Sequence, residues 1–174
     1  REGIERRRGA SSGGTQLRSS NSPGAVGVSS TRPRRIAEVH ETNSDQGKAR
    51  SAYLRALDHQ PDDVDALAGL KRIAHAEKDW QGLVGVLTRE LTLLKSDSQI
   101  PIAREIAEIW ETKLDDAAVS IDSWRKVLTL VPNDRTALEH LVALDQKEGD
   151  WAAFIDDGQA LAHYLDGAER TALL

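Results

Sequence analysis

Two stretches of sequence, KARSAYLRALDHQPDD at residues 48–63 and SIDSWRKVLTLVPND at residues 120–134, decide the fold because they share one pattern. In each, an aromatic residue is followed by leucine four positions later and by proline eight positions later. Side chains four residues apart lie on the same face of an α-helix, and proline cannot continue a helix. Each stretch therefore predicts a helix with an apolar face that ends at a proline turn.

The offset of 71 residues between these two stretches recurs along the chain. EKDWQGLVGVL begins at Glu77 and EGDWAAFIDDG begins at Glu148, so two Asp-Trp pairs stand 71 residues apart. IAEVHE at 36–41 parallels IAEIWE at 106–111 with an offset of 70, which predicts one extra residue near Lys113-Leu114. Further pairs at the offset of 71 are Leu67 and Leu138, Leu70 and Leu141, Asp63 and Asp134, and Asp79 and Asp150. The chain therefore contains two copies of one unit.

Short breaks with helix-capping chemistry separate the apolar stretches. The side chains of Asp, Asn and Ser accept hydrogen bonds from the free backbone N–H groups in the first turn of a helix. The breaks are Asn43-Ser44-Asp45, Pro61-Asp62-Asp63, Asp79, Ser96-Asp97-Ser98, Asp115-Asp116, Pro132-Asn133-Asp134 and Asp150. No stretch alternates apolar and polar residues as a strand would, so we expect an all-α body with helices of about 11 to 15 residues.

Each unit contains two helical hairpins of about 34 to 36 residues, a period typical of tetratricopeptide repeats. Ala49, Tyr53, Ala56 and Pro61 resemble the second helix of such a repeat and its closing turn, and the next unit carries Ser120, Trp124, Val127 and Pro132 there. The corresponding first-helix positions are Leu67, Leu70 and Ala74, then Ile106, Ala107 and Trp110, then Leu138, Leu141 and Val142.

The resemblance implies an all-α solenoid of about four antiparallel hairpins. We expect these hairpins at about 34–63, 64–99, 100–134 and 135–168, with 169–174 starting a further repeat of a longer array. Lys71 stands where the family has a small residue, and Glu90 stands where it has alanine. These departures leave a related class of helical repeat open.

Residues 1–33 are rich in Gly, Ser, Arg and Pro, and we predict a disordered tail there. Residues 1–35 hold eight arginines and two glutamates, a net charge of +6, whereas the rest of the chain carries −11. The tail is interpreted as a linker, with binding of nucleic acid or an anionic membrane as the alternative. Nucleic acid is disfavoured because no aromatic residue is interleaved with the arginines. No apolar run approaches the roughly 20 residues of a membrane span.

The aromatic residues are expected to have structural roles. Asp79 and Asp150 are predicted to cap a helix in each unit, so that Trp80 and Trp151 lie in the first turn and pack against the preceding helix. The alternative is an exposed tryptophan that stacks on a base or a sugar. Interior helix positions, expected in the core, are occupied by Tyr53, Trp110, Trp124 and Leu128.

No catalytic or metal-binding constellation is found in the sequence. The chain has no cysteine, and its five histidines form no pair at the helical spacing of four residues. The carboxylates of Asp58, Asp62, Asp63 and Asp65 lack the alternation and the central glycine of a calcium loop. We therefore predict no catalytic residue, no metal and no cofactor, and we do not expect an enzyme.

The resemblance implies an interaction scaffold whose first helices line a concave groove for a peptide or partner helix. Arg72 and Arg104 are the strong central cations of this groove, and the lysine/asparagine set that clamps a C-terminal carboxylate in chaperone-binding members is absent. A spacer array and an assembly or regulatory module of a larger enzyme remain alternatives. By the spacing of the family, the groove contains Arg34, Glu38, Ala68, Arg72, His75, Arg104, Glu108, Glu111, Glu139 and Ala143.

Overall fold

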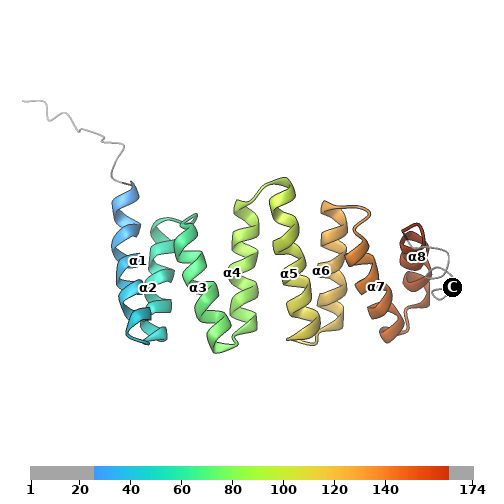
Figure 1. Ribbon diagram of the computed structural model, residues 1–174, viewed down its shortest axis with the longest axis horizontal. Coiled ribbons are helices and arrows are strands. Elements are labelled where there is room, and N and C mark those ends of the chain that lie inside the picture. Colours follow the sequence, from blue (N-terminus) through green and yellow to red (C-terminus); the bar gives the residue numbers. More distant parts are fainter. Residues whose placement is uncertain (1–25, 165–174) are drawn as a thin grey trace, which may run out of the picture.

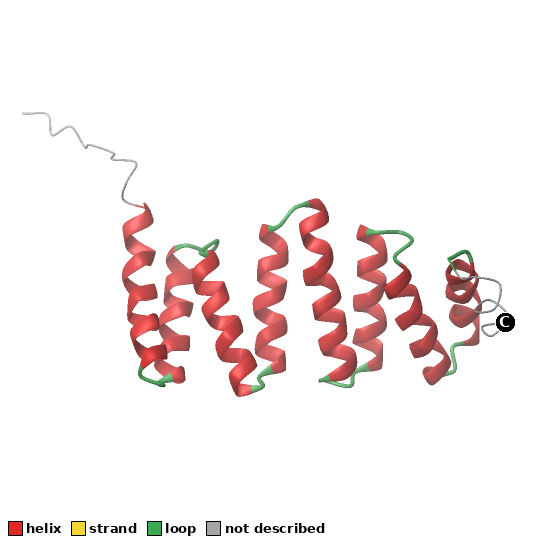
Figure 2. Ribbon diagram, in the orientation of Figure 1, coloured by secondary structure: helices red, strands yellow, loops and turns green. Residues whose placement is uncertain are grey.

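The structure, a computed structural model, describes residues 26–164 as a row of helices (Figure 1). Within these residues there is no strand (Figure 2). The helices are α1 (Val26–Thr42), α2 (Gln46–His59), α3 (Val64–Glu77), α4 (Trp80–Leu93), α5 (Gln99–Thr112), α6 (Ala117–Leu130), α7 (Arg135–Glu148) and α8 (Trp151–Ala162). A short 3₁₀ turn, η1 (Ser96–Ser98), precedes α5.

Consecutive helices are antiparallel neighbours, which makes an elongated array of four hairpins (Figure 1). We call α1, α3, α5 and α7 the first helices of these hairpins and α2, α4, α6 and α8 the second helices. The prediction of an all-α solenoid of tetratricopeptide-like hairpins is confirmed. The predicted extra residue is also present, because the α1–α2 loop has three residues and the α5–α6 loop has four.

Aspartate caps start most of the helices. In each case a side-chain oxygen accepts a hydrogen bond from the backbone N–H three residues later, an arrangement that contributes about 1 kcal/mol to stability. The capping residues are Asp45, Asp63, Asp79, Asp116, Asp134 and Asp150. The predicted cap at Ser96-Asp97-Ser98 differs, because these residues form the 3₁₀ turn and Ser98 makes no side-chain cap.

The first helix begins at Val26, eight residues before the predicted start of the repeat array at Arg34. It includes Pro33. Gly, Ser and Pro are poor helix formers, which is why the sequence pattern did not indicate a helix here. The remainder of the predicted disordered tail, residues 1–25, lies outside the described residues, and its binding to nucleic acid or to a membrane stays a prediction.

The aromatic residues of the second helices lie at the centre of the core. Tyr53 and Trp124 are the two largest fully buried side chains of the described chain. Buried alanines beside Tyr53, including Ala49 and Ala56, let neighbouring helices approach closely. Trp110 and Leu128 are only half-buried and pack at the edges of the core. The prolines that close α2 and α6 lie in exposed turns, at Pro61 and Pro132.

The two equivalent tryptophans have different environments. Trp80 packs against the preceding helix, with its ring edge-on to His75 at a centroid distance of 5.9 Å. Trp151 was expected to do the same, and this prediction is wrong: its side chain is 61% exposed. Trp80 lies between two hairpins, whereas Trp151 starts the last described helix. The position is therefore buried only where a further hairpin covers it.

The two departures from the family pattern compensate for one another. Lys71 Nζ donates a hydrogen bond to Glu90 Oε2 at 2.7 Å, across the partly buried contact between α3 and α4. In the second unit the equivalent residues are Val142 and Leu161, which are buried together in one apolar cluster. The pair is therefore ionic in the first unit and apolar in the second.

Replacement of the two tryptophans by alanine is expected to have unequal effects on stability. Trp124→Ala removes a fully buried ring, so the free energy of unfolding should fall by about 3 to 5 kcal/mol. Trp151→Ala removes an exposed ring and should change it by less than about 0.5 kcal/mol. Urea unfolding at low protein concentration, followed by far-UV circular dichroism, measures both. Equal losses would mean that Trp151 is buried after all.

Candidate functional site

The residues predicted for the groove form stripes along the first helices. We call this surface the first-helix face; its members are Arg34, Glu38, Ala68, Arg72, His75, Arg104, Glu108, Glu111, Glu139 and Ala143. In α1 the stripe reads Arg34, Glu38, Glu41, and in α5 it reads Arg, Glu, Glu again, 70 residues later. Spacings of four and three residues keep each stripe on one side of its helix.

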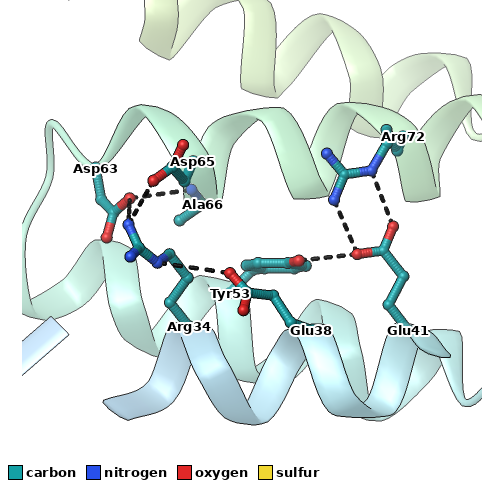
Figure 3. A network of polar contacts seen from close by, with 8 residues as sticks. All are labelled: Arg34, Glu38, Glu41, Tyr53, Asp63, Asp65, Ala66 and Arg72. Carbon is teal, nitrogen blue, oxygen red and sulfur yellow. Dashed lines mark hydrogen bonds and ion pairs between the residues drawn. The ribbon is translucent and has the colours of Figure 1, made fainter. Parts of the chain in front are cut away.

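The first arginine of each stripe binds the start of the next first helix (Figure 3). Arg34 Nη1 lies 2.5 Å from Asp65 Oδ2 and 3.7 Å from the Asp63 carboxylate, which caps α3. Arg104 pairs in the same way with Asp134, the buried cap of α7. Each capping carboxylate thus satisfies backbone N–H groups and an arginine at the same time, which fixes α3 against α1 and α7 against α5.

The last glutamate of the first stripe joins three helices (Figure 3). Tyr53 in α2 donates its hydroxyl hydrogen to Glu41 Oε2 at 2.8 Å, and Arg72 in α3 donates to the same carboxylate at 2.9 and 3.0 Å. The hydrogen bond from Arg72 lowers the pKa of Glu41. Burial, together with this glutamate, raises the pKa of Tyr53 to about 12.

The second unit repeats the junction with different residues. Glu111 accepts a hydrogen bond from Trp124 Nε1 at 2.8 Å, and His140 Nδ1 lies 2.9 Å from it. The ring of His140 also stacks on Trp124, with centroids 4.3 Å apart. The position of His140 in the first unit is Gly69, which lies against the Tyr53 ring. We had not predicted these roles. The offsets of 70 and 71 residues relate Glu41 to Glu111 and Tyr53 to Trp124, whereas Arg72 corresponds to Ala143.

The predicted cations of the first-helix face, Arg72 and Arg104, are paired within the array, and their binding of a ligand stays a prediction. Both are bound to carboxylates of a neighbouring first helix. Glu111 is likewise occupied by the junction with Trp124 and His140. Three of the predicted groove residues therefore make contacts within the array.

The exposed charges of this face that form no ion pair with another described helix are acidic, whereas Arg72, 58% exposed, is paired with Glu41. Glu38 contacts only Arg34 of its own helix, at 3.7 Å, and Glu108 is exposed at the equivalent position of α5. Glu139 pairs with Arg135 within α7. His75 is exposed and lies 4.0 Å from Glu105. The first-helix face thus presents glutamates at repeated positions.

A buried pair of carboxyl groups lies apart from this face, between α7 and α8. Asp145 is buried beside Asp157, whose carboxylate lies 3.5 Å from Arg125. Burial, reinforced by Asp157, raises the pKa of Asp145 to about 6. In the first unit the three equivalent positions are Leu54, Ala74 and Val86, which line a hollow of about 200 Å³. The charged cluster therefore replaces an apolar contact of the other unit.

The described residues contain no group of three or more His, Cys, Asp or Glu side chains that could hold a metal ion. Among the helices of the described region, none is long and apolar enough to cross a membrane.

Comparisons with known proteins give a structural likeness only. No protein-family model matches the chain, and no curated protein matches its sequence. The crystal structure of MamA protein is 18% identical at a TM-score of 0.49, over 79% of this chain and 73% of that one. YrrB, a TPR protein with an unusual peptide-binding site, is 13% identical at a TM-score of 0.47, over 75% of this chain and 66% of that one. Neither likeness assigns a role to any residue.

Gly69 is expected to be irreplaceable where it meets Tyr53. An alanine Cβ at this position would lie 2.3 Å from Tyr53 Cζ. We expect Gly69→Ala to lower the free energy of unfolding by about 1 to 3 kcal/mol, because a buried ring would have to move. The matched control is Gly85→Ala in α4, where nothing lies within 4 Å of the new Cβ. It should raise stability by up to about 1 kcal/mol through helix propensity. Urea unfolding compares the two, and a stabilised Gly69→Ala would contradict the junction geometry.

The raised pKa of Asp145 predicts a pH-dependent effect of Asp145→Asn. The folded-state pKa of about 6 is above the usual aspartate value of 3.8, so this group stabilises the fold at acidic pH, and its contribution is lost as the pH rises through about 6. Asparagine removes the charge, so the free energy of unfolding of the variant should exceed that of the wild type by about 1 to 2 kcal/mol at neutral pH.

This advantage should shrink towards pH 4.5, where the wild-type carboxyl group holds its proton. Urea unfolding at both pH values measures the difference, with Asp122→Asn, an exposed carboxylate of α6, as the control. A difference that does not change with pH would mean that Asp145 is ionised throughout.

Proposed function

We propose that this tetratricopeptide-like solenoid is an interaction scaffold whose first-helix face binds a protein segment rich in lysine or arginine. The observation that carries the proposal is the unequal pairing of charges on this face. Each arginine of the stripes is neutralised within the array, whereas Glu38 and Glu108 remain exposed at the same repeat position. A basic partner can therefore pair with these two carboxylates without displacing a contact between helices.

The pairing of each arginine supports this direction of charge. Arg34 contacts two carboxylates of α3, and Arg72 is bound by Glu41 through two hydrogen bonds. Arg104 is held by the buried carboxylate of Asp134. An acidic ligand would have to compete with these internal partners. A basic ligand would compete at Glu38 only with Arg34 of the same helix, at 3.7 Å, and the described residues show no ion pair of Glu108.

The repeat geometry also defines a register for the ligand. The middle positions of the stripes are Glu38 in α1, Arg72 in α3, Glu108 in α5 and Ala143 in α7. A segment that crosses the first helices in order meets an acidic, a basic and an acidic position in turn. We expect basic side chains to face the two glutamates and none to face Arg72. Exposed ion pairs of this kind are weak individually, so affinity should be modest and sensitive to salt.

The experiment compares fluorescent peptides of equal length that are basic, acidic or neutral, by anisotropy with the purified chain. The basic peptide should bind most tightly, and its affinity should fall between about 50 and about 200 mM salt because exposed charges are screened. The double variant Glu38→Gln/Glu108→Gln should lower the affinity for the basic peptide by about 2- to 20-fold, which corresponds to the loss of two exposed ion pairs.

The matched control is Asp58→Asn/Asp122→Asn, which removes the same charge from exposed positions of the second helices. It should leave the affinity within about twofold of the wild type if the first-helix face is the site. Equal weakening by both double variants would mean binding to overall charge. Tighter binding of the acidic peptide would contradict the proposal and indicate that the arginines bind the ligand.

A further inference from the structure

The first and last helices of the described region expose side chains that the repeat buries elsewhere. At one end, Ile36 and Val39 in α1 are 41% and 58% exposed. At the other end, Trp151 and Ile155 in α8 are 61% and 53% exposed. We call the first group, with its neighbours Arg32, Arg35 and His40, the N-terminal end face, and we call Trp151 and Ile155, with Asp156, the C-terminal end face. Grouped exposed apolar side chains typically mark a contact surface.

The internal repeat shows what covers the N-terminal end face. At an offset of 70 residues, Ile36 and Val39 correspond to Ile106 and Ile109 in α5. These two pack against α4, the second helix of the preceding hairpin, and Ile109 is only 7% exposed. Nothing described precedes α1 at the equivalent place. The N-terminal end face is thus the half of a hairpin junction that receives a second helix.

The C-terminal end face is the other half of the same junction. At an offset of 71 residues, Trp151 and Ile155 correspond to Trp80 and Val84 in α4. Val84 is 9% exposed and Trp80 is partly buried, because α5 covers them. One chain therefore carries an exposed surface of the α4 type at one end and an exposed surface of the α5 type at the other.

We propose that the chain associates head to tail with a second copy of itself, with α8 of one copy packed on α1 of the next as α4 packs on α5. A second copy supplies the complementary half of the junction to each of the two end faces. The flanking charges favour the pairing, because exposed Arg32 and Arg35 border one face and exposed Asp156 borders the other. An open hollow of about 610 Å³ lies against Ile36, Val39 and His40.

A head-to-tail contact has consequences that a two-fold dimer does not. The two contact surfaces differ, so each copy keeps one free end and further copies can add. The first helices of successive copies follow one another as α3 follows α1, so the first-helix face continues across the junction. One helix pair makes a small interface, so the association should be weak and dependent on concentration.

The experiment is sedimentation velocity of the full chain over a range of concentrations from about 5 to about 500 μM, because small interfaces dissociate easily. The average mass should rise with concentration. Val39→Glu and Ile155→Glu should each abolish the association, because each buries an unpaired carboxylate in the junction. The matched control is Val64→Glu, a 69% exposed position at the start of α3, which should associate like the wild type.

Mixing the two variants distinguishes a head-to-tail contact from a two-fold one. Val39→Glu keeps an intact C-terminal end face and Ile155→Glu keeps an intact N-terminal one. An equimolar mixture should therefore form a dimer and nothing larger, although each variant alone is monomeric. Circular dichroism of each variant should match the wild type, because the substituted side chains are largely exposed.

Three results would overturn the proposal. One is a wild-type chain that stays monomeric at every concentration. Another is association that persists in both end-face variants while they remain folded. The third is a mixture of the variants that stays monomeric, because it would show that the two end faces do not bind each other.

Discussion

A buried aromatic donor that needs an acceptor is the constraint on which the polar structure of this solenoid depends. Tyr53 and Trp124 each carry a polar hydrogen that would be costly to bury without a partner. Glu41 and Glu111 accept these hydrogens from the ends of the first helices. The carboxylate then takes a further partner from the next first helix, Arg72 in one unit and His140 in the other. Each aromatic residue therefore holds three helices in one geometry.

The same constraint explains the charge of the first-helix face. Arginines that might have served a ligand are bound within the array, where they hold carboxylates and capped helix ends in place. The glutamates at the middle of the stripes join no neighbouring helix among the described residues and remain exposed, Glu38 with only a 3.7 Å contact to Arg34 of its own helix. Whether a charged side chain holds helices together or stays available to a partner thus depends on its position along the stripe of its helix.

Differences between the two units occur in groups of residues that touch. Lys71 and Glu90 form an ion pair where the other unit buries Val142 with Leu161. Gly69 makes room for the Tyr53 ring, whereas the equivalent His140 stacks on Trp124. Residues in contact depend on each other for stability, so a change at one position is accommodated at its neighbour. A position that departs from the family pattern is therefore understood only together with its partner.

The sequence by itself determined the helices, their aspartate caps, the hairpin repeat and the buried aromatic positions. These depend on periodicity and capping within a few residues, which are visible in one dimension. The tertiary structure alone decided that Arg72 and Arg104 are paired and that Trp151 is exposed. It also decided that α1 begins at Val26. Charge pairing and burial depend on which hairpin lies alongside. The spacing of residues within one helix does not predict the side chains that this neighbouring hairpin contributes.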